Sequence, residues 1–252
     1  MAGYGDFAYY YDLLTENVDY TAISEYISNL LVKNGVDGGI LLDLACGTGE
    51  LSFLLSGKGY DVIGVDASEE MLSVANEKKT ESENSDIIFL CQRMEELDLF
   101  GTVNAVVCVL DSINHITDIE ALKEAFRRVS LFMEDEGIFI FDVNTPYKHR
   151  KVLGNNTFVY DMDEVYCVWQ NTTDEEMLTE ISLDIFEKDE QEDVYYKYSE
   201  SFCERGYEIS FLKELLTQYK FEIIAVYNEM SENELCENSE RAVFVLKKHG
   251  TQ

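Results

Sequence analysis

Short apolar runs alternate with amphipathic helical patterns through the first 146 residues of the chain. Apolar residues recur at helical spacing from Ile23 to Leu31, and Asn34-Gly35 then supplies a helix stop. The apolar runs predict five strands, over residues 40–44, 62–66, 87–91, 105–110 and 138–141. Short, continuously apolar strands separated by helices indicate a parallel sheet that is covered on both faces, which is a doubly wound α/β fold.

Two positions predict where individual helices begin. Ser68 is a favourable N-cap residue, and acidic side chains follow it in the first turn, where they stabilise the positive end of the helix dipole. Thr117 and Glu120 have the spacing of a capping box ahead of a second amphipathic helix. We therefore expect helices to begin directly after Ser68 and Thr117.

The pattern changes after Pro146, the only proline in the chain. Four stretches rich in aromatic and β-branched residues follow without helices between them, at residues 157–160, 165–169, 181–186 and 194–198. They predict antiparallel strands. After them come a helix and two strands, at residues 209–219, 221–227 and 241–247. The predicted fold class is α/β, a doubly wound, mostly parallel seven-stranded Rossmann-like sheet with an antiparallel β insertion after strand five.

The same patterns predict how the chain is divided into domains. Residues 1–146 and 207–252 are expected to form one Rossmann-like domain, which binds its ligand at the carboxyl ends of the strands. Residues 147–206 are expected to form an inserted antiparallel β subdomain that covers the substrate.

Composition and charge narrow the class of partner. Hydrophobic residues make up 46% of the 252 residues, which is enough for a full core. The 50 acidic residues outnumber the 19 basic ones and give a formal net charge of −31. Such a surface repels phosphate backbones and anionic lipid headgroups. We therefore expect a small-molecule substrate, no nucleic-acid partner and no membrane partner, and a monomer or homodimer.

The cysteines and histidines do not predict a metal site. The six cysteines form no C-x-x-C pair, and none of the three histidines is paired at metal-ligand spacing. Free thiols are typical of a reducing compartment. The first residues lack the basic region and apolar run of a signal peptide, so the sequence predicts a cytoplasmic protein.

The strongest chemical signal lies at the end of the first predicted strand. Asp43 precedes the small-residue turn Ala45-Cys46-Gly47-Thr48-Gly49, where glycines let a ligand approach the backbone closely. Asp66 stands at the end of the second predicted strand, where a carboxylate can accept hydrogen bonds from a ribose diol. The glycine turn alone is weak, but strand, turn, helix, strand and terminal acid in this order predict a nucleotide-containing cofactor.

A nicotinamide-dependent oxidoreductase is the main alternative. Its fingerprint is G-x-G-x-x-G/A, whereas Gly47-Thr48-Gly49-Glu50-Leu51-Ser52 has serine at the last position. The acid at Asp43 adds little to a pyrophosphate site but suits a cofactor that carries an ammonium and a sulfonium. A non-catalytic cofactor-binding module is a second alternative.

The same residues resemble class I S-adenosylmethionine-dependent methyltransferases. Residues 41–50 look like their motif I and residues 62–72 like their second motif, and the resemblance continues through Gln92-Arg93-Met94 and residues 107–115. The chain is most similar to the small-molecule branch that includes amino-sugar N-methyltransferases. The resemblance implies methyl transfer from S-adenosylmethionine to an amine or hydroxyl of a small molecule by in-line displacement.

The resemblance also implies a role for each matching residue. The turn after the first strand would line the methionine end of the cofactor, and Asp66 would hold the ribose hydroxyls. Residues after the second and third strands would enclose the adenine, and Tyr11 would cover the pocket. The full set expected to bind the cofactor is Tyr11, Asp43, Ala45, Gly47, Gly49, Asp66, Ala67, Met71, Arg93, Met94, Val109 and Leu110.

Two positions depart from the family's pattern. Arg93 stands where members usually have Asp, and arginine cannot accept the hydrogen bond of the adenine amino group. Phe202 stands near a position where related chains often carry His, which removes one candidate base.

The candidate catalytic residue is His115, which follows strand four at the rim where substrate would enter. Asp111, Tyr160 and Trp169 are candidates for the substrate pocket, although aromatic residues on strands also pack as core. A base is needed only if the nucleophile arrives protonated. The chain lacks an Asn/Asp-Pro-Pro-aromatic tetrapeptide after strand four, which favours a small-molecule acceptor over a nucleic-acid base.

Overall fold

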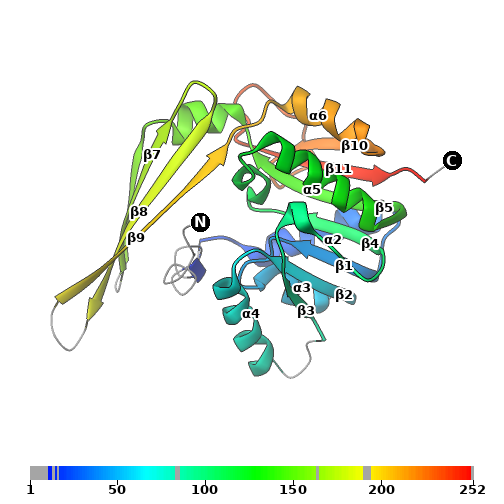
Figure 1. The fold of residues 1–252 in the computed structure, drawn as a ribbon, viewed down its shortest axis with the longest axis horizontal. Coiled ribbons are helices and arrows are strands. Elements are labelled where there is room, and N and C mark those ends of the chain that lie inside the picture. The colour runs from blue at the N-terminus through cyan, green and yellow to red at the C-terminus, as the bar shows by residue number, and fades with distance from the viewer. Residues whose placement is uncertain are drawn as a thin grey trace.

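The protein was analysed as a computed structural model, which describes residues 11, 12, 15, 17–82, 86–162, 165–189 and 194–250. Two sheets organise these residues (Figure 1). The larger one has seven strands, in the spatial order β10-β11-β5-β4-β1-β2-β3, and the smaller one has the order β6-β7-β8-β9.

The strands of the larger sheet are β1 (Gly39–Leu44), β2 (Tyr60–Asp66), β3 (Ile88–Cys91), β4 (Val103–Cys108), β5 (Met133–Asn144), β10 (Phe221–Asn228) and β11 (Arg241–Lys248). The α-helices are α2 (Tyr20–Lys33), α3 (Glu50–Ser56), α4 (Glu69–Glu81), α5 (Ile119–Phe132) and α6 (Ile209–Gln218). Short helical turns are η1 (Met94–Glu96), η2 (Ser112–His115) and η3 (Lys148–Leu153).

The larger sheet is parallel except at one strand. β1 pairs in parallel with β2 and β4, and β3 and β5 extend the parallel set on either side. β11 runs antiparallel between β5 and β10. The doubly wound, mostly parallel seven-stranded fold that the sequence predicted is therefore confirmed.

Each face of this sheet carries its own hydrophobic core, because successive side chains of a strand point to opposite faces. Phe139 and Phe141 of β5 pack with residues of α5 and α6, and Phe141 stacks on Phe244 of β11 at a centroid distance of 4.7 Å. Ile138 and Ile140 of the same strand pack with residues of α2 and α3 on the other face. Strands that are apolar on both faces are the physical basis of the continuous runs in the sequence.

One of the two predicted helix starts is correct. The Ser68 hydroxyl accepts a hydrogen bond from the Met71 amide and caps α4 as predicted. The predicted cap at Thr117 is wrong, because the Asp118 carboxylate accepts from the Ala121 amide at 2.8 Å and α5 begins one residue later. A carboxylate at this position both caps the helix and neutralises the positive end of its dipole, so Asp118 is the stronger N-cap.

The smaller sheet is an antiparallel meander of β6 (Thr157–Asp161), β7 (Val165–Thr173), β8 (Leu178–Asp189) and β9 (Val194–Arg205). It extends away from the larger sheet as an arm (Figure 1). Its inner face carries the buried side chains of Val165, Ile181 and Ile185, which form one cluster with Met71 of α4. The hydrophobic contact between α4 and this inner face holds the arm against the Rossmann-like sheet.

The base of the arm is fixed by a buried histidine. His149 of η3 is fully buried, its Nδ1 lies 2.9 Å from the Thr179 hydroxyl of β8, and its Nε2 lies 3.4 Å from the Asn114 side chain. A Cβ atom at position 206 would come within 2.8 Å of the imidazole, so only glycine fits beside His149.

In the described part of the chain no helix is long and apolar enough to cross a membrane.

Candidate functional site

The turn after β1 adopts a left-handed backbone at three positions. The φ angles are +61° at Ala45, +54° at Gly47 and +82° at Gly49. Glycine adopts this conformation without strain, whereas Ala45 does so at a cost of about 1–2 kcal/mol. A Cβ atom at Gly47 would meet only the Tyr11 ring, at 4.0 Å, so the turn leaves room above its backbone that a side chain would fill.

Asp66, at the end of β2, is hydrogen-bonded to the turn. Its Oδ2 accepts from the Gly47 amide and its Oδ1 from the Ser68 amide, each at 2.9 Å. Burial raises the pKa of this carboxyl, while the amides of Ser68, Gly47 and Ala67 oppose the rise. Each carboxylate oxygen has two lone pairs, so Asp66 can accept further hydrogen bonds from a ligand.

Asp43 lies beneath the same turn. It is 2% exposed and accepts a hydrogen bond from the Ser52 hydroxyl of α3. Burial raises its pKa to about 7, against the Ser52 hydrogen bond, and Asp66 adds to the rise. Asp43 therefore ties the end of β1 to the start of α3 and fixes the geometry of the turn between them.

Tyr11 and Asp12 lie beside this turn. The Thr48 hydroxyl donates to Asp12 Oδ1 at 2.6 Å, and Lys78 of α4 lies 2.6 Å from both Asp12 and Glu50. These contacts hold Tyr11 beside Gly47 and against the cluster that contains Met71.

The remaining predicted cofactor residues surround the carboxyl ends of the strands. Met71 is 4% exposed and packs toward the arm, Met94 packs against the core beneath α5, and Arg93 pairs with Glu95 at 2.6 Å. The carbonyl of Ala67 lies 3.7 Å from the Cys91 sulfur. Val109, after β4, is buried in the core of the α2–α3 face.

The segment after β4 is the second strained turn of the site. Leu110 and Asp111 have φ angles of +58° and +56°, which non-glycine residues rarely adopt. Asp142 of β5 is fully buried and accepts hydrogen bonds from both of their amides, at 3.0 and 2.7 Å. Arg241 of β11 then joins Asp142 and Asp111, at 2.6 and 2.7 Å. Such strain persists only where neighbouring groups enforce it, and it is typical of functional sites.

The charges around Asp111 favour its ionised form. Burial alone would raise the pKa of Asp111, but Arg241, Lys148 and His115 outweigh burial and lower the pKa to about 2. The Asp111 carboxylate is therefore already paired with the Arg241 guanidinium.

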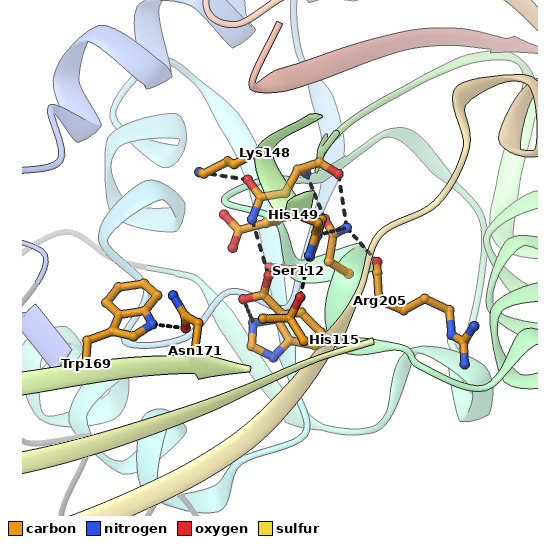
Figure 2. A network of polar contacts seen from close by, with 12 residues as sticks. Ser112, His115, Lys148, His149, Trp169, Asn171 and Arg205 are labelled. Atoms are coloured by element: carbon orange, nitrogen blue, oxygen red, sulfur yellow. Dashed lines mark hydrogen bonds and ion pairs between the residues drawn. The ribbon is translucent and has the colours of Figure 1, made fainter. Parts of the chain in front are cut away.

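His115 lies where the two sheets meet (Figure 2). Its Nε2 is 3.8 Å from Oε1 of Glu204, on β9, and its ring lies 5.2 Å from that of Phe202. Burial lowers the pKa of His115, although Asp111 and Asp66 oppose the shift, so the imidazole is neutral near pH 7. A ring nitrogen of His115, a carboxylate oxygen of Asp111 and one of Glu204 all lie within 4.8 Å of one another.

Buried amides connect this group to the base of the arm (Figure 2). Asn114 donates to the carbonyl of Arg205 at 2.8 Å and accepts from the backbone amide of Asn144 at 2.9 Å. The Asn144 side chain donates to Glu204 Oε2 at 3.3 Å and accepts from Lys148 Nζ at 2.9 Å. These bonds set the position of the arm relative to the end of β4.

Tyr160 and Trp169 lie side by side on β6 and β7, at a centroid distance of 6.3 Å. Trp169 packs against the inner-face cluster and donates to the Asn171 side chain at 2.5 Å, whereas Tyr160 is 36% exposed. The aromatic pair therefore borders the inner face of the arm rather than filling its core.

Sequence reasoning missed four residues of this site: Asp142, Asn171, Glu204 and Arg241. A charged residue inside an apolar strand was a usable signal for Asp142 and Arg241, because such a charge is buried only with a partner. A cavity of about 360 Å³ lies elsewhere, between η3, α6 and residues 235–239.

Comparison with known proteins places the chain among methyltransferases. A profile described as a methyltransferase domain matches residues 41–137. YqeM of Bacillus subtilis, classed among methyltransferases, is 32% identical over 250 residues, covering 98% of each chain. A crystal structure of an S-adenosylmethionine-dependent methyltransferase from Clostridium acetobutylicum is 34% identical with a TM-score of 0.88, covering 97% of this chain and 98% of that one.

The fold is also shared with more distant enzymes. The sugar N-methyltransferase KedS8 from Streptoalloteichus has a TM-score of 0.79 at 20% identity and covers 95% of this chain and 93% of that one. The parallel sheet, its glycine turn and the terminal acid define an enzyme that uses a nucleotide-containing cofactor. The chain belongs to the S-adenosylmethionine-dependent methyltransferases, and its cofactor is S-adenosylmethionine. None of these comparisons favours the nicotinamide-dependent or non-catalytic alternatives.

Proposed function

We propose that this enzyme transfers the methyl group of S-adenosylmethionine to an amine or hydroxyl of a small molecule. The observation that carries the proposal is the pair of strained turns at the ends of β1 and β4, which are adjacent strands. One turn offers open backbone at Gly47 and the carboxylate of Asp66, and the other presents Asp111 and His115.

The residues of the first turn fit the cofactor. The space above Gly47 is bounded by the Tyr11 ring, which suits a flat or extended ligand beneath it. Asp66 has acceptor capacity left for ribose hydroxyls, and the acidic side chains of Asp43 and Asp66 favour a cationic ligand. Met71, Arg93 and Met94 remain the residues proposed for the adenine end, and Val109 and Leu110 those for the methyl-donor end.

A small acceptor is supported by three observations. The net charge of −31 disfavours nucleic acid and anionic membranes. We propose that residues 147–206 form a substrate-covering subdomain, since the inner face of the arm lies over the β4 turn. KedS8, which shares the fold, is named as a sugar N-methyltransferase.

The chain's own residues contribute positioning, exclusion of water and a proton acceptor. When bound, the cofactor supplies a methyl group that is already activated on a sulfonium. Holding nucleophile and methyl donor in line in a dry site is worth several powers of ten in rate. His115 is neutral, so its imidazole can accept the proton of an acceptor that arrives protonated.

A transfer assay tests this proposal. Radiolabelled S-adenosylmethionine is incubated with matched panels of small amines, small alcohols, RNA and DNA. We expect label in at least one small molecule, inhibition by S-adenosylhomocysteine, and at least tenfold less transfer with Asp66→Ala at a cofactor concentration below that needed for saturation. Label that enters only nucleic acid or protein would contradict the proposal.

A further inference from the structure

The inner face of the arm carries a mostly buried glutamate, one of whose carboxylate oxygens accepts no hydrogen bond from the described residues. Glu204 is 4% exposed, and its Oε2 accepts from the Asn144 side chain at 3.3 Å. Its Oε1 accepts no hydrogen bond from the described residues, and its nearest cationic partner is His115 Nε2 at 3.8 Å.

The same face carries a buried donor without a partner. Asn171 of β7 is 5% exposed, and its Oδ1 accepts from Trp169, but its Nδ2 has no hydrogen-bond partner among the described residues. Figure 2 shows the Asn171 side chain rising from β7 on the side that holds Ser112, His115 and Lys148.

The register of the arm places the two groups on one face. Asn171 pairs with Ile181 and Ile181 with Phe202, so these three side chains form a cross-strand row. Glu204 is two residues beyond Phe202 on β9 and therefore points to the same side. An unpaired donor and an unpaired acceptor on one buried face indicate a polar ligand.

The charges around Glu204 indicate the sign of that ligand. Three carboxylates, of Asp111, Asp142 and Glu204, face two permanent cations, Lys148 and Arg241. Arg241 is paired with Asp111 and Asp142, so Glu204 is the carboxylate that has no arginine partner. Burial, with a further contribution from Asp111, accordingly raises the pKa of Glu204 to about 8. A cation beside Oε1 would replace the proton that this carboxyl otherwise keeps.

A metal ion fits this group less well than an organic cation. Asp111, His115 and Glu204 approach one another within 4.8 Å, but Asp111 Oδ1 already lies 2.7 Å from Arg241. The positive charge of a guanidinium that is already paired with this carboxylate repels a metal cation there. An ammonium needs only hydrogen-bond acceptors, which Glu204 Oε1 and neutral His115 supply.

We propose that Glu204 and Asn171 form the acceptor subsite of this methyltransferase. Glu204 Oε1 receives the ammonium of an amine, and Asn171 Nδ2 donates a hydrogen bond to an oxygen of the same molecule. The proposal rests on the function proposed above and selects amine over hydroxyl as its nucleophile. His115 Nε2 takes the proton that the ammonium must lose before its lone pair is free, and the resulting imidazolium lies 3.8 Å from the Glu204 carboxylate.

Three small probes separate the two halves of the subsite. Ethanolamine carries an ammonium and an oxygen, ethylamine carries the ammonium alone, and ethylene glycol carries oxygens alone. Each is titrated into the complex with S-adenosylhomocysteine, and binding is followed by the NMR signal of His115, which His115→Gln assigns. We expect ethanolamine to bind most tightly, ethylamine next, and ethylene glycol at least tenfold more weakly than ethanolamine.

Variants then test the two residues. Glu204→Gln is expected to weaken both amines at least tenfold, and Asn171→Ala to reduce the affinity for ethanolamine to that for ethylamine. Glu180→Gln is the matched control, because Glu180 is exposed and neighbours Thr179, the cross-strand partner of Glu204. This control is expected to change neither affinity more than twofold.

The pH dependence provides a readout that a structural role would not change. Asp111, His115, Lys148 and Arg241 surround Glu204 from the other elements of the site. The pKa of Glu204 is about 8, so below pH 8 the affinity for ethylamine should rise about tenfold per pH unit, and above it the affinity should level off. The amine itself, with a pKa of about 10, stays protonated over this range. The Glu204→Gln profile should be flat.

The outcomes separate this proposal from the proposed function. Calorimetry first establishes that the wild type and all variants bind S-adenosylhomocysteine equally. Absence of that binding in the wild type contradicts the proposed function itself. If S-adenosylhomocysteine binds, three results would each contradict the acceptor subsite. The amines could leave the His115 signal unchanged, they could bind no more tightly than ethylene glycol, or they could bind Glu204→Gln as well as wild type.

Discussion

The cofactor side and the acceptor side of the site are built in different ways. The proposed cofactor side is centred on one continuous segment, residues 43–68, in which Asp66 accepts a hydrogen bond from the Gly47 amide and Asp43 accepts one from the Ser52 hydroxyl. The proposed acceptor side joins residues from the turn after β4 and from η2, β5, β7, β9 and β11, and its polar contacts span up to 130 positions of the chain. Local contacts form one turn, whereas the long-range contacts also hold the arm to the sheet. Changes on the acceptor side should therefore cost stability, and changes on the cofactor side mainly ligand affinity.

The largest effect is expected from Arg241→Met. It leaves the carboxylates of Asp142 and Asp111 in a mostly buried environment without their guanidinium, and breaking a buried pair in this way costs about 3–5 kcal/mol. Denaturant unfolding measures the loss. Lys247→Met on the same strand is the control, because its partner Glu136 is exposed and such pairs contribute at most about 1 kcal/mol. Equal losses in the two variants would remove the distinction between the two sides.

A comparable effect is expected from acid at the base of the arm. Burial lowers the pKa of His149 to about 4 from an ordinary 6.5, with Lys148 acting in the same direction and Asp111 opposing it. Between these values the unfolded chain binds the proton and the folded one does not, so stability falls as the pH falls. The loss begins below pH 6.5 and levels off near pH 4 at about 3 kcal/mol.

The measurement is the free energy of unfolding of wild type minus that of His149→Gln across this range. The difference isolates His149 from the carboxylates that titrate in the same window. The exposed His249, changed to Gln, is the control and is expected to leave the profile unchanged. A wild-type profile parallel to that of His149→Gln would show that this histidine does not carry the acid sensitivity.

A smaller loss of stability is expected on the cofactor side from Gly49→Ala. The φ angle of Gly49 is +82°, and a Cβ atom there would lie 3.0 Å from Phe89 and 3.2 Å from Phe53. Strain and overpacking together should cost about 2–3 kcal/mol. Gly35→Ala is the matched control, since its φ is +89° but its Cβ would meet nothing within 4 Å, so only about 1 kcal/mol is expected. Thermal unfolding of both variants tests the difference.

The fold and the glycine turn after β1 could be predicted because their signals are local. Continuous apolar runs specify strands buried on both faces, and the turn at Gly47 and Gly49 shows directly in the chain as glycine. Even here local rules compete, and the cap of α5 falls on Asp118 rather than on Thr117. The limits predicted for two arm strands were also too short, because β8 and β9 continue through mostly polar positions that carry no hydrophobic alternation.

The acceptor side could be predicted only in part, because its residues meet through tertiary structure. His115 and Asp111 were expected near the rim from their place after β4, but nothing local indicates that Glu204 lies 3.8 Å from His115. That contact depends on the path of the arm, which His149 and Asn114 fix through bonds to β8 and to Arg205. The same holds for Arg241, whose partners precede it by 99 and 130 positions.

The cofactor site is tested most directly by calorimetric titration with S-adenosylmethionine and S-adenosylhomocysteine, with NAD as control, on wild type and Asp66→Ala. We predict micromolar binding of the first two and none of NAD. In Asp66→Ala the affinity should fall at least tenfold, about 1.4 kcal/mol or more, with little loss of stability. Binding that is unchanged in Asp66→Ala, or absent in folded, cofactor-free wild type, would contradict the assignment of this turn as the cofactor site.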